Sequence, residues 1–407
     1  MAREQTGGSY LFFIQDELPK QEAHIIQVVQ CANAAANLGL PTVLAHLDKS
    51  FRAMSPISWV SPFQLQVPEH DFANFFNTQK SLKLLPLSVP WPIGRLRSKL
   101  TNSSTFICKY YFPIHLAKRT KLVHTRDWNF AKAAIKCGVP VIYECHHHEK
   151  KKYETDFVNH PLFQVAVTVV ETVRENMISN GIPREKTFRI HNGYNHQFSV
   201  RHSSAASEWR EKLLINKYEK LVVYAGALYP FKGIDVLLQA AKSLPTTKFA
   251  LAGGPEEQLQ KYKNELLEKK LVNVELLGFL PQQELASLLQ AADALVHPHC
   301  LGEAATFTSP LKLFDYMASG TPIVATKIPS LVEFYASPAI AGWCEPDNPE
   351  KLIECLCSVL TTHPRKIEGY RESLDFVEQF SWENRISKIL ERVNPEIQQK
   401  LFLTKGC

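Results

Sequence analysis

Residues 221–233, LVVYAGALYPFKG, give the strongest indication of how this chain folds. The first five residues are apolar or aromatic and prone to β-structure, and a turn that begins with Gly226 follows them. From Ile234 onward, apolar residues recur with helical spacing. A buried strand that ends in a glycine turn before a helix is the repeating unit of a parallel sheet. The stretch therefore predicts an α/β domain.

Three segments downstream repeat this pattern of an apolar run, a turn with glycine or proline, and a helix. They are FALAGGP at 249–255, VELLGFLP at 274–281 and AADALVHP at 291–298. In open parallel sheets, ligands bind beyond the carboxyl ends of the strands, which is where these turns lie. We therefore expect a ligand site built from the turns that contain Gly226, Gly253 and Gly278.

A short predicted helix with a carboxylate on its apolar face follows, in TSPLKLFDYMASG at 308–320. Ser309 suits the N-cap, and Gly320 suits the left-handed residue just past the helix. Helical spacing places Asp315 beside apolar residues, where a carboxylate is costly unless it receives hydrogen bonds. The free N–H groups at the helix N-terminus attract anions. The helix thus offers a phosphate site and a hydroxyl acceptor, as a nucleotide sugar requires. The alternative is an ordinary capped helix in which Asp315 pairs with Lys312.

The first half of the chain shows a second series of predicted strands, several of which end at polar residues. We expect strands at 10–14, 41–47, 121–124, 139–143, 163–170 and 188–191. A helix is predicted over 20–38 because Gly39 closes its pattern. Residues 55–100 contain many prolines, which predicts loops and short helices there. Asn-Gly-Tyr at 192–194 forms a turn that we interpret as the junction between two domains.

Composition indicates a globular protein of two domains, and its charge is compatible with an anionic ligand without requiring one. A chain of 407 residues is too long to fold around one ordinary hydrophobic core. Its 45% hydrophobic and 21% charged residues are typical of a globular protein. The net charge of +6 suits nucleotides or phosphates, and the lack of a basic stripe interleaved with aromatics argues against nucleic-acid binding. Nine cysteines without a regular framework, and no bilayer-spanning run or signal-peptide pattern, favour reduced thiols in a cytoplasmic protein.

The order and spacing of these motifs resemble glycosyltransferase family 4, most strongly over residues 190–335. The resemblance implies an α/β chain with the GT-B fold, in which two Rossmann-like domains with parallel sheets face each other. It implies an N-terminal acceptor-binding domain at 1–193 and a C-terminal nucleotide-sugar-binding domain at 194–380. Residues 381–407 would then hold a C-terminal helix that returns to pack on the N-terminal domain.

Two positions depart from the family pattern. Members often have Gly-Arg-Leu and then Lys-Gly in the first turn, and here Lys232 and Gly233 match whereas Ala227 replaces the arginine. Members also have two glutamates separated by seven residues, and here Phe307 stands for the first and Asp315 for the second. These departures keep open a non-catalytic nucleotide-sugar-binding protein derived from the same fold.

The resemblance implies donor-binding roles for residues of the C-terminal domain. Lys232 would neutralise the departing diphosphate together with the N-terminus of the 308–320 helix, so we expect no metal and no other cofactor. Taken alone, Lys232 could equally be a solvated loop residue. Asp315 would accept hydrogen bonds from the two ribose hydroxyls. The other expected donor-binding residues are Gly226, Gly253, Gly278, Leu280, Ser309, Leu311 and Lys312.

His146 follows a predicted strand and aligns with the family histidine that faces the reacting sugar. A neutral imidazole there could hydrogen-bond the donor sugar or orient the acceptor hydroxyl, so we expect it to be catalytic with Lys232. The alternatives are a polar loop or a metal site built on residues 146–148. Adjacent side chains point in different directions, and the sequence offers no cysteine or acidic partner at a suitable spacing.

The candidates for acceptor binding are His24, Arg126 and Lys152. The two basic residues suit a phosphorylated acceptor such as fructose 6-phosphate, which the sucrose-phosphate synthases of the family use. The lysine run that includes Lys152 could instead be a solvated face. Residues 80–100 mix basic and apolar side chains, so contact with a membrane surface and a lipid or polysaccharide acceptor form a further alternative.

We therefore expect a retaining, metal-independent glycosyltransferase that moves a hexose to an acceptor hydroxyl, with UDP-glucose as the expected donor. The residues themselves do not distinguish UDP from GDP or ADP. A nucleotide-sugar 2-epimerase is another enzyme class on the same fold, and it would need acids in the N-terminal domain that the sequence does not reveal.

Overall fold

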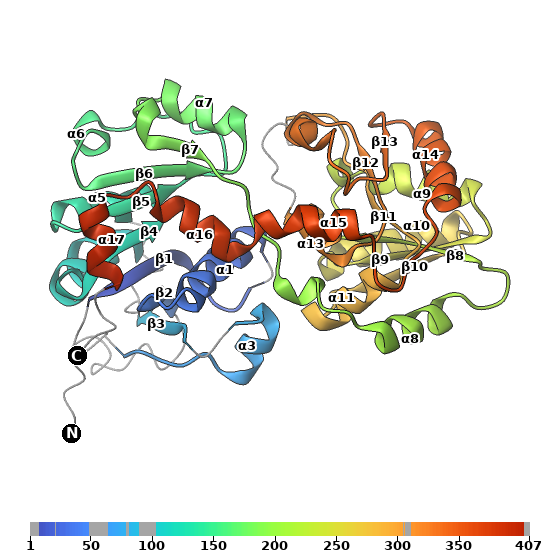
Figure 1. Ribbon diagram of the computed structural model, residues 1–407, viewed down its shortest axis with the longest axis horizontal. Helices are drawn as coiled ribbons and strands as arrows, with labels where there is room; N and C mark the ends of the chain where they lie inside the picture. The colour runs from blue at the N-terminus through green and yellow to red at the C-terminus, as the bar shows by residue number, and fades with distance from the viewer. Residues whose placement is uncertain are drawn as a thin grey trace. The chain divides into compact units, whose positions relative to one another are not determined.

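The computed structural model describes residues 8–20, 22–48, 64–78, 81–88, 103–303, 305 and 311–402 (Figure 1). The chain divides into two compact units. Unit 1 comprises Met1–Asn192 together with Trp382–Cys407, and unit 2 comprises Gly193–Ser381. The domain boundaries predicted after residues 193 and 380 each lie one residue away from these divisions.

Unit 1 is built on a seven-stranded parallel sheet with the order β3-β2-β1-β4-β5-β6-β7. Its strands are nearly continuous runs of buried residues, which is typical of parallel sheets. The strands are β1 (Ser9–Glu17), β2 (Thr42–Asp48), β3 (Lys83–Ser88), β4 (Thr120–Thr125), β5 (Val141–Glu144), β6 (Phe163–Thr168) and β7 (Thr187–Arg189).

Helices connect these strands in the alternating manner of an α/β domain. The helices of unit 1 are α1 (Ala23–Asn37), α3 (His70–Phe76), α4 (Ser103–Phe106), a π-helical segment at Ile107–Leu116, α5 (Trp128–Lys136), α6 (Thr155–Val158), α7 (Glu171–Ser179), α16 (Trp382–Leu390) and α17 (Pro395–Phe402). Asp127 is the N-cap of α5, because its side chain accepts a hydrogen bond from the N–H of Phe130 at 2.8 Å.

The strand β3 shows that the prediction of only loops and short helices over 55–100 is wrong. It pairs with β2 in parallel register at the edge of the sheet. Pro86 conceals it in the sequence, because proline is rare in strands although an edge strand tolerates it. Leu84 and Leu85 are buried, so they do not form the apolar side of a membrane-surface segment. Residues 89–100 lie outside the described part of the chain.

Unit 2 contains a six-stranded parallel sheet with the order β10-β9-β8-β11-β12-β13. Its strands are β8 (Lys220–Ala225), β9 (Thr247–Ala252), β10 (Val274–Gly278), β11 (Ala294–His297), β12 (Ile323–Thr326) and β13 (Gly342–Cys344). Its helices are α8 (Ser203–Leu213), α9 (Ile234–Ser243), α10 (Glu256–Glu268), α11 (Gln282–Ala291), α13 (Leu311–Ser319), α14 (Pro349–Thr362) and α15 (Arg371–Val377). This confirms the βα units that the sequence predicts.

The C-terminal helix α16 belongs to unit 1 although it follows unit 2 in the sequence. In Figure 1 it is drawn in red beside α1, with which it is in contact. Trp382, Ile386 and Ile389 are buried on one face of it, which explains why an amphipathic pattern marks this helix. The expectation of a returning C-terminal helix is confirmed.

Among the described helices, none combines the length and the apolar composition that a bilayer crossing requires.

Candidate active site

Lys232 lies in a turn whose backbone is fixed by the segment that follows β11. The turn comes after β8, and Gly233 ends it with a φ of 77°. The N–H of Cys300 donates to the carbonyl oxygen of Phe231 at 3.0 Å. A Cβ atom on Gly233 would lie 1.7 Å from the carbonyl oxygen of Pro298, so only glycine fits this approach.

The ammonium group of Lys232 is partly buried and has no anionic partner among the described residues. Its Nζ lies 5.1 Å from the centroid of the Phe231 ring. Burial lowers the pKa of Lys232 to about 8. A buried charge is unfavourable unless it is paired, so an anionic ligand at this position would relieve an existing cost. The carboxyl end of β8 is also where ligands of such sheets bind.

Two further predicted glycines bring neighbouring turns close to each other. Gly253 has a φ of 109°, and a Cβ there would lie 2.4 Å from the carbonyl oxygen of Gly226. The N–H of Gly253 donates to the carbonyl oxygen of Gly278 at 2.6 Å. Leu280 is partly buried and packs against the core of unit 2. The three turns after β8, β9 and β10 therefore meet at one edge of the sheet.

Asp315 is buried in α13, as the sequence predicts, with 8% of its surface exposed. Its Oδ1 accepts a hydrogen bond from the N–H of Asn195 at 3.3 Å, and its Oδ2 lies 3.4 Å from Nζ of Lys312. Burial raises the pKa of Asp315, and the nearby Lys312 charge opposes this rise. Both contacts are long, so a carboxylate with about four acceptor positions retains capacity for more donors.

The beginning of α13 is described only from Leu311 onward. Leu311 and Lys312 are partly buried at its first two positions. Ser309 and Phe307 lie outside the described residues, so the predicted N-cap stays a prediction. Gly320 has a φ of 66°, which confirms the predicted left-handed residue after the helix.

In unit 1, His146 is held by a buried carboxylate. Its Nε2 lies 2.6 Å from Oε1 of Glu144, the last residue of β5, and 12% of the His146 side chain is exposed. An ionised carboxylate can only accept, so the proton of the imidazole is on Nε2 and Nδ1 keeps a lone pair. Burial and the charge of Arg126 lower the pKa of His146 to about 3. The imidazole is therefore neutral, as expected.

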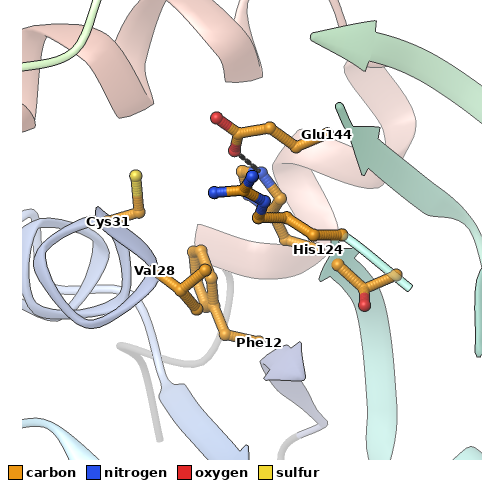
Figure 2. Close-up of a pocket in the computed structure, with 7 residues that line it drawn as sticks. Phe12, Val28, Cys31, His124 and Glu144 are labelled. Atoms are coloured by element: carbon orange, nitrogen blue, oxygen red, sulfur yellow. Dashed lines mark hydrogen bonds and ion pairs between the residues drawn. The ribbon is translucent and has the colours of Figure 1, made fainter. Parts of the chain in front are cut away.

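The Glu144 carboxylate is the centre of a buried hydrogen-bond network. Figure 2 shows His124 pointing toward Glu144, with Nε2 and Oε2 at 2.9 Å. Gln27 of α1 donates to Oε1 at 2.8 Å, and Arg385 of α16 donates to the same oxygen. The positive charge of Arg385 lowers the pKa of Glu144 well below its usual value despite the burial that would raise it. The carboxylate is therefore ionised and fully occupied by its neighbours.

Arg126 lies at the small pocket that Figure 2 draws, and among the described residues no carboxylate is hydrogen-bonded to its guanidinium. The pocket is lined by Phe12, Val28, Cys31, His124, Thr125, Arg126 and Glu144. Among the described residues, the one hydrogen bond of the Arg126 guanidinium is a long one to Oε1 of Gln27, at 3.4 Å. Burial lowers the pKa of Arg126, although arginine stays charged at neutral pH. Most of its donors therefore remain available for an anion.

The other two candidate acceptor residues lie elsewhere. Nε2 of His24 lies 3.1 Å from Oδ2 of Asp16, at the start of α1. Lys152 is exposed in the loop between β5 and α6. The structure thus brings His146 and Arg126 together around Glu144, and it does not place Lys152 in this network.

One expectation about metal ligands is wrong. The ligand atoms of Cys145, His147 and Glu149 lie within 4.8 Å of one another, so the histidine run does have cysteine and acidic neighbours. In an extended loop, residues i, i+2 and i+4 project to the same side. Residues 145, 147 and 149 can therefore meet, although adjacent residues such as His146 and His147 point in different directions. The cluster is satisfied internally, since Nε2 of His147 lies 2.8 Å from Glu149 and burial raises the pKa of Cys145, which disfavours a thiolate ligand.

Sequence reasoning misses two groups of residues around these sites. Glu144 and Arg385 carry no motif, and the available signal is a charged residue on the apolar face of α16. The sequence shows His297 and His299 at the end of a predicted strand but not that both are buried. Two imidazoles beside a proline at the end of a parallel strand were the available signal.

Comparisons with known proteins agree with this architecture. Residues 205–370 match the family described as Glycosyl transferases group 1. An uncharacterized glycosyltransferase of Methanocaldococcus jannaschii is 25% identical over 300 residues, which are 65% of this chain and 72% of that protein. A D-inositol 3-phosphate glycosyltransferase of Corynebacterium urealyticum is 28% identical over 198 residues. The chain spans just under half of that relative, since the alignment covers 46% of each.

Solved structures extend the similarity to both units. The sucrose-phosphate synthase of Thermosynechococcus elongatus has a TM-score of 0.66 at 17% identity, covering 98% of this chain and 100% of that one. The HepE protein of Anabaena, in complex with UDP-glucose, has a TM-score of 0.65 at 17% identity, covering 94% and 98%. At such identity the likeness concerns the fold. Residues 205–370 thus match the group 1 glycosyltransferase family, and the chain as a whole has the GT-B fold of these solved structures.

Proposed function

We propose that the protein is a retaining glycosyltransferase of the family 4 type that transfers a hexose, glucose, from UDP-glucose to an acceptor hydroxyl. The observation that carries this proposal is the partly buried Lys232, in a fixed turn at the end of β8, which has no anionic partner among the residues described. An ammonium group in that position suits a diphosphate, because it stabilises the negative charge that develops as the phosphate leaves.

The donor subsite is proposed for unit 2. Asp315 receives only long hydrogen bonds and so has capacity for the two ribose hydroxyls. The turns at Gly253 and Gly278 bring backbone groups to the same sheet edge as Lys232. The HepE structure contains UDP-glucose, which supports the choice of donor for a chain of this fold.

The acceptor subsite is proposed for unit 1, with a sugar phosphate as acceptor. No carboxylate is hydrogen-bonded to the guanidinium of Arg126 within the described ranges, so its paired N–H groups can bind a phosphate. The names of two similar proteins, a D-inositol 3-phosphate glycosyltransferase and a sucrose-phosphate synthase, support an acceptor that carries phosphate.

The proposed reaction needs no covalent enzyme intermediate. The acceptor oxygen attacks the anomeric carbon on the face from which the diphosphate leaves, and the bond from that carbon to the phosphate oxygen breaks. The acceptor proton passes to an oxygen of the departing diphosphate. Lys232 stabilises the diphosphate, and His146 accepts a hydrogen bond at Nδ1 that orients a sugar or acceptor hydroxyl. With Lys232 in this role, a metal is not required.

The proposal can be tested with a panel of nucleotide sugars, first for binding by thermal shift and then for turnover of the donor. UDP-glucose should raise the melting temperature, because a ligand that binds only the folded state stabilises it. It should also be consumed when a sugar phosphate is present. Binding without turnover for any acceptor would favour the non-catalytic alternative, to which Ala227 in place of the family arginine points. Stabilisation by another nucleotide sugar alone would overturn the choice of UDP-glucose.

A further inference from the structure

Two stacked imidazoles are buried at the end of β11, the strand between β8 and β12 in unit 2. The rings of His297 and His299 have centroids 3.9 Å apart and an interplanar angle of 30°. Only 4% of His297 and 5% of His299 is exposed. Oγ1 of Thr326 lies 3.3 Å from the carbonyl oxygen of His297 and 2.7 Å from that of His299, which fixes the backbone of both.

This pair is attached directly to the turn that carries Lys232. Pro298, between the two histidines, is the residue whose carbonyl oxygen packs against Gly233. Burial and, to a smaller extent, the charge of Lys232 lower the pKa of His297 to about 3. Burial lowers the pKa of His299 well below its usual value, with smaller effects from His297 and Lys232. Both imidazoles are thus neutral beside a cation that has no anionic partner among the described residues.

A structural role alone does not account for His297. Its Nδ1 is fully buried and has no hydrogen-bond partner in the part of the chain that the structure describes. An unsatisfied buried polar group destabilises the folded protein, and an apolar side chain of similar shape would avoid that cost. His297 adjoins Pro298, which packs against the turn of Lys232, so one ligand at this strand end could satisfy both the unpaired imidazole nitrogen and the ammonium group.

We propose that His297 and His299 form, with Lys232, the phosphate-binding part of the donor site, and that the imidazole N–H groups donate to phosphate oxygens of a nucleoside diphosphate. This inference rests on the proposed function and adds two donor-binding residues to it. Neutral imidazoles contribute directed hydrogen bonds without adding repulsion to the ammonium group. Such contacts would also partly compensate for the family arginine, whose position Ala227 occupies here.

The test measures the dissociation constants of UDP and of uridine for the full-length protein and three variants. His297→Phe and His299→Phe keep an aromatic ring for stacking but remove the nitrogen atoms. His363→Phe, beyond the end of α14 in the same unit, is the matched control. Each of the first two variants should weaken UDP binding about tenfold, as expected for a lost hydrogen bond to a charged group. Uridine has no phosphate, so its affinity should stay within about twofold, and the control should match the wild type.

The outcomes separate this inference from the proposed function. If the wild-type protein binds none of UDP, ADP and GDP, both fall. If it binds one of them and both histidine variants bind it equally well, only the inference falls. A parallel loss of UDP and uridine affinity would also overturn it, because that result indicates a general packing defect. Circular dichroism melts establish folding, and His299→Phe tests the inference by itself if His297→Phe does not fold.

Discussion

Arg385 of α16 donates a hydrogen bond to the carboxylate of Glu144 at the end of β5, although 241 residues separate them in the chain. Their side chains are 1% and 2% exposed. Arg385 also donates to the carbonyl oxygen of His191 at 2.6 Å, just before the chain leaves unit 1. The C-terminal helix therefore does more than cover unit 1. It supplies the charge that keeps Glu144 ionised, and Glu144 in turn orients His146.

Replacing Arg385 with methionine should destabilise unit 1 by about 3–5 kcal/mol, because a buried carboxylate loses its counter-ion. The double variant Glu144→Gln/Arg385→Met should be less destabilised than the sum of the two single variants, since it leaves no uncompensated charge. Hydrogen exchange of peptides from β5 and α16 during urea titration measures the stability of this unit. Strict additivity of the two substitutions would show that the pair is not coupled.

The close approach at Gly233 gives a second prediction. Alanine at this position meets both a left-handed backbone and a carbonyl oxygen, whereas Gly138 has a φ of 75° with nothing within 4 Å of a new Cβ. Gly138→Ala should thus cost about 1–2 kcal/mol from the backbone alone. Gly233→Ala should cost about 1–3 kcal/mol more from overpacking. Denaturant unfolding measures the free energy of unfolding of both variants. An equal loss in the two would mean that the backbone at Pro298 can move to accommodate the new Cβ.

Local patterns predict much of the fold but not the contacts between distant segments. The apolar runs before Gly226, Gly253 and Gly278 are short-range signals, and all three strands are present. Asp315 and Gly320 follow from helical spacing and end chemistry, which act within a few residues. The strand β3 is missed because a strand at an edge can include Pro86, so tertiary position outweighs local propensity.

The candidate sites show the same division. The position of Lys232 could be predicted because glycine and lysine are adjacent in one turn. The network around Glu144 could not, because its members come from α1, β4, β5 and α16 and meet only when the sheet forms. For the same reason the sequence does not predict that the 298–300 segment pairs with the Lys232 turn. The roles proposed for these residues in donor and acceptor binding stay predictions.

Donor affinity should depend on pH through Lys232. Its pKa is about 8 in the unliganded protein, and a bound diphosphate favours the ammonium form, so the pKa rises on binding. Affinity should be nearly constant below pH 8 and fall by up to tenfold per pH unit above it. Calorimetric titration with UDP from pH 7 to 9.5 measures this. Lys232→Arg retains its charge throughout and should give a flat profile, and a fall of equal steepness in that variant would assign the pH dependence to another group.

Arg126→Gln should act on the acceptor and not on the donor. If Arg126 binds the acceptor phosphate, its loss should raise KM for a sugar phosphate about tenfold to a hundredfold, as expected for charge-assisted hydrogen bonds. The dissociation constant of UDP should not change. Lys152→Gln, which alters an exposed residue outside the Glu144 network, should have a smaller effect. Steady-state kinetics with phosphorylated and unphosphorylated sugars compare the two, and an unaltered KM in Arg126→Gln would contradict this role.

The central claim is that the ammonium group of Lys232 stabilises a departing diphosphate, and the turnover of UDP-glucose by Lys232→Gln tests it most directly. Lys327→Gln, which removes an exposed lysine paired with Glu345 at 3.0 Å, serves as the control in the same unit. With both variants folded, turnover in Lys232→Gln should fall by about 10²–10³, the range found when one group that stabilises developing charge is removed. Turnover close to that of the wild type in Lys232→Gln would contradict the account.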